Sequence, residues 1–174
     1  MPIFNDNSMK GAFAGCYRFD QDINFWDTSN ITDMSEMFYD ALSFNQPLND
    51  WDTSNVTNMS RMFYLAKSFN QPLNGWDISN VTNLSGMFQG AESFNGDIDN
   101  WNTANVKDMS NMFAADTKYI KERPYIVYAY TIFNKPINSW NTSNVTNMSR
   151  MFYLAKSFNQ PLNDWNTSNV TNMS

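Results

Sequence analysis

The stretch from Trp51 to Gly75 reads WDTSNVTNMSRMFYLAKSFNQPLNG, and close copies of it recur along most of this 174-residue chain. The tryptophans that mark its phase are Trp26, Trp51, Trp76, Trp101, Trp140 and Trp165. Their spacing is 25 residues in every interval except the fourth, which measures 39. Such recurrence is typical of repeat proteins, in which each unit packs on its neighbours. We therefore expect residues 1–174 to form one domain of about six units, with partial units at both ends.

One segment of the unit has the spacing of an amphipathic helix. Its apolar residues, at positions i, i+3, i+4 and i+7, are Met59, Met62, Phe63 and Ala66. This pattern predicts a helix of about two turns, with Asn58 or Ser60 accepting its first amides and Pro72 following its end. The remaining arc, near residues 73–82, would carry one or two short β-strands. The expected fold class is an α/β repeat solenoid, because a single unit buries too little apolar surface to fold alone.

A column of asparagines repeats as regularly as the tryptophans. Its members are Asn30, Asn55, Asn80, Asn105, Asn144 and Asn169. An amide that recurs in a stack can bond the equivalent turn above and below, whereas an unsatisfied buried amide would cost about 1–3 kcal/mol. We therefore predict an asparagine ladder at an inward bend, with ligand contact through these amides as the alternative. A second column alternates aspartate with asparagine, as in Asp52 and Asn141, and its side chains are expected to bond backbone in a turn.

Charge and composition argue against several classes of function. The net charge is −6, and no run of Lys or Arg is long enough to follow a nucleic-acid backbone. The chain has no histidine and a single cysteine, Cys16, which leaves neither a conventional catalytic triad nor a usual zinc site. An aspartate position that also accepts asparagine cannot hold a general acid or base. We expect a protein that is not an enzyme, binds no cofactor or metal, and does not insert this segment into a membrane.

The motif W-[DN]-T-S-N-V-T-[DN]-M-S-x-M-F-x-x-A-x-x-F-N-x-P-L, which runs from Met9 to Ser174, resembles the repeat of BspA-like leucine-rich-repeat bacterial surface proteins. The resemblance is to the branch with 25- or 26-residue repeats. It implies a right-handed, curved solenoid at the cell surface or outside the cell, with roles in adhesion or host contact. The sequence itself contains no recognisable export signal, and the residues before Cys16 are too polar for a lipoprotein cleavage site.

One segment, at about residues 114–132, is not explained by the repeat. It contains 14 residues beyond the period and concentrates tyrosine and cationic side chains on an otherwise acidic chain. Its candidate partner-binding residues are Lys118, Tyr119, Lys121, Arg123, Tyr125, Tyr128 and Tyr130. Tyrosine and arginine are enriched in contact surfaces, although a long loop is also tolerated when it has no role. The insert is therefore either a binding element or a passive addition.

Two hypotheses of function follow from these features. The first is an interaction or adhesion module that binds a protein or a glycan through the solenoid and its insert. The second is a structural array that assembles end to end, with no small-molecule ligand. A more distant third is ice binding by the regular threonine columns, such as Thr53 and Thr57 with their counterparts in the other units.

Overall fold

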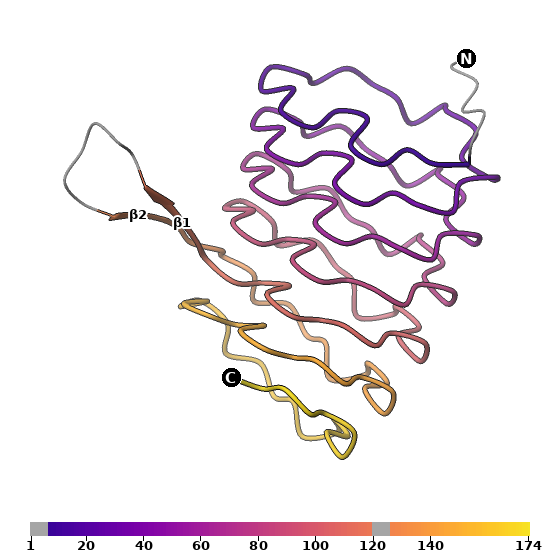
Figure 1. The fold of residues 1–174 in the computed structure, drawn as a ribbon. Coiled ribbons are helices and arrows are strands. Elements are labelled where there is room, and N and C mark those ends of the chain that lie inside the picture. The colour runs from indigo at the N-terminus through magenta and orange to yellow at the C-terminus, as the bar shows by residue number, and fades with distance from the viewer. Residues whose placement is uncertain (1–6, 120–125) are drawn as a thin grey trace.

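The chain forms a stack of similar turns, each about 25 residues long. The computed structural model describes residues 7–119 and 126–174, with backbone alone for 117–119 and 126–128. Figure 1 shows the turns lying one below another, with the two ends of the chain at opposite ends of the stack. Indole, phenylalanine and methionine columns run through the interior along the stacking direction. The turns therefore share one continuous core.

The predicted helices are absent from residues 7–119 and 126–174, so the α/β solenoid with one helix per turn was the wrong fold class. Among the described residues the elements of regular structure are two strands, β1 (Asp116–Tyr119) and β2 (Ile126–Ala129). The segment expected to be helical is a chain of tight turns. Arg61 and Leu65 both have φ near +54°, and their counterparts in the other turns also have positive φ, except Ala115, after which the hairpin begins. A right-handed helix cannot include residues in this left-handed region.

The hydrogen bonds of residues 59–66 explain how this segment imitates helical periodicity. Alternate amides donate to the next turn, as when Arg61 N–H donates to Ser85 O at 2.8 Å and Phe63 N–H donates to Met87 O at 2.9 Å. The amides between them donate to the carbonyl three residues back, as Ala66 N–H does to Phe63 O. These tight turns bring Met59, Met62, Phe63 and Ala66 inward together. The apolar spacing is therefore the one a short helix would have.

The predicted strands near residues 73–82 are also absent. In their place the turns are joined by isolated parallel bridges at one residue per turn, for example Asn58 with Asn83 and Asn83 with Asp108. Thr82 N–H donates to Thr57 O at 2.9 Å beside this column. Because each turn makes only a one-residue bridge, no sheet extends along the stack.

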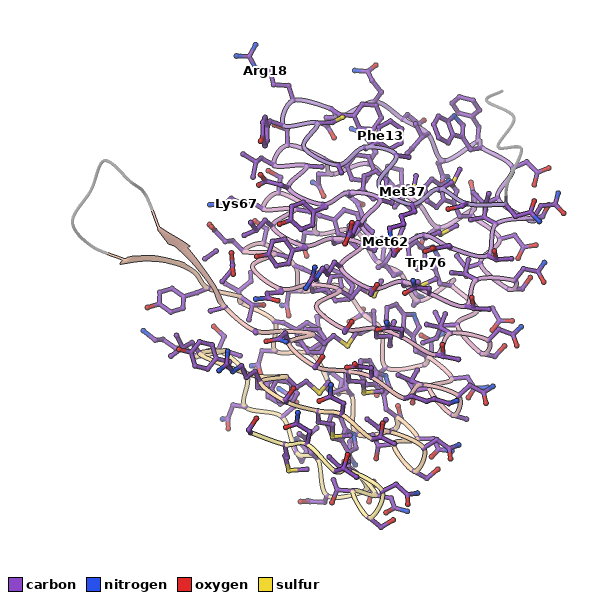
Figure 2. The ribbon with its side chains drawn as sticks, in the orientation of Figure 1. Phe13, Arg18, Met37, Met62, Lys67 and Trp76 are labelled. Atoms are coloured by element: carbon purple, nitrogen blue, oxygen red, sulfur yellow. The ribbon has the colours of Figure 1, made fainter. Side chains whose placement is uncertain are left out.

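Aromatic rings fill the interior. Phe63 stacks on Phe69 of its own turn, with 4.0 Å between ring centroids, and on Phe88 of the next turn at 5.7 Å. Figure 2 shows Phe13, Met37, Met62 and Trp76 inside the stack, whereas Arg18 and Lys67 extend from the edge on the side of the hairpin. Offset stacking of this kind adds about 0.5–1.5 kcal/mol per pair to the burial of the rings.

The insert forms an antiparallel hairpin that leaves the stack on one side (Figure 1). Asp116 pairs with Ala129, and Tyr119 pairs with Ile126. The chain enters the hairpin after Ala115 and returns to the interior at Phe133, which is fully buried. The hairpin therefore interrupts one turn without interrupting the aromatic core.

Candidate interaction surface at the hairpin

The tryptophan column is structural. Each indole from the second to the sixth donates its Nε1–H to a backbone carbonyl of the preceding turn at 2.9–3.1 Å, as Trp76 does to Leu48. Trp51, Trp76, Trp101 and Trp140 are buried, while Trp26 and Trp165 are partly buried at the two ends of the stack. The five indoles from Trp51 onward therefore make equivalent hydrogen bonds and link neighbouring turns.

The asparagine column forms a ladder, but on the exposed side and not at an inward bend. Asn55 donates its side-chain N–H to Ser29 O at 2.8 Å, and the next four members make the same bond to the turn before them. A second ladder, which the sequence reasoning missed, runs through Asn45, Asn70, Asn95, Asn134 and Asn159. In that ladder the side-chain oxygen accepts the backbone amide of the next turn. Its sequence signal is the asparagine that follows the second phenylalanine of each of these turns, as Asn70 follows Phe69.

The aspartate column closes turns, as the sequence predicted. Asp52 Oδ1 accepts the backbone amide of Ser54 at 3.0 Å and its hydroxyl at 2.6 Å, and Asp27 does the same with Ser29. These bonds hold the pKa of both carboxyls below its ordinary value. The bonds from the serine hydroxyls contribute most, followed by those from the backbone amides. In the threonine column that includes Thr53, four side chains are buried and donate their hydroxyls to the next turn, whereas Thr167 on the last turn is exposed; the four are Thr28, Thr53, Thr103 and Thr142. These four side chains therefore present no surface to ice, whereas the column of Thr57 is exposed.

The first strand of the hairpin is held at its base by the turns on its N-terminal side. The Tyr64 hydroxyl hydrogen-bonds the Asp116 carboxylate, and Gln89 Nε2 donates to Asp116 Oδ1 at 3.4 Å. Burial, followed by the charge of Asp116, raises the pKa of Tyr64 far above its ordinary value. A Cβ on Gly90 would lie 2.6 Å from Leu65 Cδ2 and 3.1 Å from Asp116 Cβ. The base of the hairpin thus occupies space that a side chain at position 90 would fill.

The second strand leads into a contact with the turn on the C-terminal side. Tyr130 follows β2, and Lys156 Nζ lies 3.2 Å from its hydroxyl and 4.2 Å from its ring centroid. Nearby, Ala115 N–H donates to Tyr153 O at 2.8 Å, and the Arg150 guanidinium carbon lies 5.9 Å from the Tyr153 ring centroid. The hairpin is therefore attached to turns on both of its sides.

The structure places the candidate insert residues only in part. Lys118 and Tyr119 belong to β1 and Tyr128 to β2, where the backbone alone is described. Lys121, Arg123 and Tyr125 lie outside the described residues. Tyr130 is half-buried against Lys156. Sequence reasoning missed Arg150, Tyr153 and Lys156, which lie in an ordinary repeat and become distinctive only beside the hairpin.

The cations beside the hairpin differ in their partners. Arg61 pairs with Glu36 at 3.8 Å, and Lys67 pairs with Glu92 at 2.6 Å. Within the described residues no carboxylate forms an ion pair with Arg150 or Lys156, both of which are exposed. Tyr153 is 47% exposed beside them. We call Arg150, Tyr153 and Lys156 the cationic cluster.

Two further features were found in the described part of the chain. A hollow of about 740 Å³ opens on the last turn, lined mostly by apolar side chains that include Met148, Phe152 and Trp165. Across residues 7–119 and 126–174 no helix could cross a membrane, and no three Cys, Asp or Glu side chains gather as they would around a metal ion.

Comparison with known proteins identifies one family. A family model described as "Mycoplasma protein of unknown function, DUF285" matches residues 7–125 and 114–174. None of the curated proteins and none of the solved structures matches the chain. The resemblance to BspA-like surface proteins stays a prediction, since no comparison tests it.

Proposed function

This chain belongs to the DUF285 family of Mycoplasma proteins of unknown function, and we propose that it is a non-catalytic interaction module that binds a protein or glycan partner through its hairpin. The observation that supports this proposal most is that the hairpin is fixed at its base. The hairpin departs from an otherwise regular scaffold, yet contacts on both sides hold its base in place. These contacts involve Asp116 and Gly90 on one side and Lys156 on the other.

The scaffold supplies the second argument. The recurring asparagine, aspartate and threonine side chains bond backbone within their own turn or a neighbouring one, so these polar columns are committed to holding the stack together. The hairpin breaks the repeat pattern, and the cationic cluster beside it presents exposed cations and a partly exposed tyrosine. Sites that differ from a regular scaffold are where repeat proteins have room for a specific contact.

Deletion of Thr117–Tyr130, closed with a short Gly-Ser linker, tests this function. The probes are an immobilised glycan array and a displayed peptide library, each incubated with the intact chain and with the deletion variant. We expect ligands that bind the intact chain alone, while circular dichroism and thermal melting show that the variant keeps its fold. Ligands that bind both chains equally would assign recognition to the repeats and reject the hairpin.

The alternative function is a self-assembling array, which the apolar hollow on the last turn favours. It requires association that rises with concentration and does not depend on the hairpin. Sedimentation velocity on both chains tests it, and a sedimentation coefficient that is constant with concentration would reject it.

A location at the cell surface, implied by the resemblance to BspA-like proteins, is part of the same proposal. Labelling of intact producing cells with an antibody to the hairpin would support it. Labelling only after the cells are permeabilised would reject it.

A further inference from the structure

We infer that Asn74 is a site of spontaneous modification, at which the side-chain amide is lost by deamidation, and that the folded stack protects Asn95 from the same reaction. Asparagine is followed by glycine at these two positions and nowhere else in the chain. The two dipeptides, Asn74–Gly75 and Asn95–Gly96, differ in what holds their side chains in place. Both lie in the repeats, so the modification is independent of the hairpin and its proposed function.

Deamidation joins the side chain of asparagine to the backbone nitrogen of the residue that follows. That nitrogen loses its proton to base and attacks the asparagine Cγ. The new N–Cγ bond closes a cyclic succinimide, while the Cγ–Nδ2 bond breaks and the amide leaves as ammonia. Water then adds to a carbonyl of the ring and opens it to aspartate or isoaspartate. Glycine favours the reaction, because no side chain shields the attacking nitrogen or restricts its backbone.

The turn before Trp76 leaves both reacting groups free. At the equivalent corner of the preceding unit, Asp50 N–H donates to Asn24 Oδ1 at 3.1 Å, and Asn24 Nδ2 donates back to Asp50 Oδ2 at 2.6 Å. Gly75 occupies the position of Asp50 and has no side chain with which to form this clamp. Within the described part of the chain, neither the Gly75 amide nor the Asn74 side chain makes a hydrogen bond, and both residues are exposed. The two groups can therefore meet without breaking an existing bond.

Asn95 is restrained, because it belongs to the ladder in which side-chain oxygens accept backbone amides. Its Oδ1 accepts the Asn134 amide at 2.9 Å, and its own amide donates to Asn70 Oδ1 at 2.8 Å. Gly96 is buried, and a Cβ there would lie 2.7 Å from Gln71 O. Turning the Asn95 Cγ toward the Gly96 nitrogen would break the bond to Asn134 in a place with little room for the ring. The fold therefore opposes the reaction at this position.

Modification of Asn74 would weaken the contact between two turns. Trp101 Nε1–H donates to Leu73 O at 3.0 Å, and Asn100 Nδ2 donates to Asn74 O at 2.7 Å. Isoaspartate carries the main chain through the side-chain carbons and lengthens it by one atom at this position. Both bonds depend on the direction of the carbonyls at 73 and 74. An aged chain should therefore be less stable than a fresh one.

The chain contains its own matched control. Asn163 ends a stretch identical to the one that ends at Asn74, but it is followed by Asp164. The Asp164 amide donates to Asn138 Oδ1 at 3.1 Å, so the nitrogen that would attack is already bonded. The variant Gly75→Asp gives the first copy the same dipeptide. The stack already accommodates aspartate at this position of the unit, so the variant should keep its fold.

The experiment incubates the folded chain in heavy-oxygen water at mildly alkaline pH and follows each asparagine by peptide mapping and mass spectrometry. Uptake of heavy oxygen marks each deamidation. We expect Asn74 to react about tenfold faster than Asn95, the factor that corresponds to one hydrogen bond that must first break. In Gly75→Asp the rate at position 74 should fall to that of Asn163. In urea, which removes the ladder, Asn95 should react nearly as fast as Asn74.

Equal rates at Asn74 and Asn95 in the folded chain would overturn the inference. The same ratio of rates in urea as in the folded chain would also overturn it, because the difference would then come from the flanking residues. If Gly75→Asp left the rate at position 74 unchanged, the Gly75 amide would not be the attacking group, and the inference would fail. Thermal unfolding of fresh and aged samples tests the weakened contact, and equal melting temperatures would reject it.

Discussion

Residues 53–74 and 142–163 share one sequence of 22 residues, but they lie in turns with different neighbours. Their backbones agree: φ is 54° at both Arg61 and Leu65, and 53° and 54° at their counterparts Arg150 and Leu154. Their surroundings do not. Tyr64 stacks on Tyr39 with 4.6 Å between centroids and bonds Asp116, whereas Tyr153 is 47% exposed. Local sequence thus sets the path of a turn, while the adjacent turns set what its side chains do.

The largest expected difference between the two copies is in their phenylalanines. Phe63 is fully buried between Phe38, Phe69 and Phe88, and Phe152 is only partly buried on the last turn. We expect Phe63→Ala to lower the free energy of unfolding by about 3–5 kcal/mol. Phe152→Ala should lower it by about 1–2 kcal/mol, because less apolar area is buried there. Urea unfolding followed by tryptophan fluorescence measures both. Equal losses would contradict the difference in packing.

The next effect concerns Gly90, which contacts both the first copy and the hairpin. Gly90→Ala, at a φ of +67°, places a methyl group 2.6 Å from Leu65 Cδ2, the end of a side chain that must move, and 3.1 Å from Asp116 Cβ at the base of the hairpin, so both backbone strain and crowding are expected. Gly15→Ala is the control, because its φ is +70° and nothing lies within 4 Å. We expect the control to cost about 1–2 kcal/mol from the backbone alone and Gly90→Ala to cost more. Thermal unfolding compares them. If the two variants have the same stability, the packing of the hairpin base against the stack does not require glycine at position 90.

A smaller effect on stability is expected from the paired positions Tyr64 and Tyr153. Because the pKa of Tyr64 is raised above the ordinary 10.0, its neutral form contributes stability that is fully present below pH 10.0 and is lost as the pH rises further. Tyr64→Phe should lower stability at neutral pH by about 1 kcal/mol through loss of the bond to Asp116. Tyr64→Phe should also reduce the loss of stability at alkaline pH. Tyr153→Phe should change neither the stability at neutral pH nor its dependence on alkaline pH. Unfolding at neutral and alkaline pH tests this, and a Tyr64 that ionises at its ordinary pKa in an ultraviolet titration would refute it.

The smallest effect is expected from the ion pairs of the first copy. Arg61 and Glu36 are exposed and 3.8 Å apart, so Glu36→Gln should change the free energy of unfolding by no more than about 0.5 kcal/mol. Urea unfolding at low and high salt measures the change. A loss well above 1 kcal/mol would mean that this pair holds the stack together and does more than neutralise the cations there.

The sequence predicted the repeat, its period and the turn role of Asp52, but it predicted the wrong secondary structure. The reason lies in residues 59–66, where tight turns bury the same apolar positions as a helix would. A contrary signal was present, because four of the six glycines, at 11, 15, 86 and 90, fall in the two columns that have positive φ. Positions that accept glycine so often indicate a left-handed backbone.

The candidate site was predictable only in part. The insert was apparent because it breaks the period, and Tyr130 was among the residues chosen from it. The cationic cluster was not apparent, because the equivalent positions in the first copy, Arg61, Tyr64 and Lys67, hold the same residue types as Arg150, Tyr153 and Lys156. No pattern within a single unit can distinguish copies that are identical.

By itself, the sequence determined which residues recur at 25-residue intervals, and hence which side chains share a column, since equal residues at equal intervals meet when turns stack. The tertiary structure alone decided what each column member contacts. Glu36 and Glu92 neutralise the cations of one copy, whereas the hairpin lies beside the cations of the other. The physical reason is that each turn takes its hydrogen bonds, ring contacts and ion partners largely from the turns next to it, which lie about 25 residues or more away along the chain.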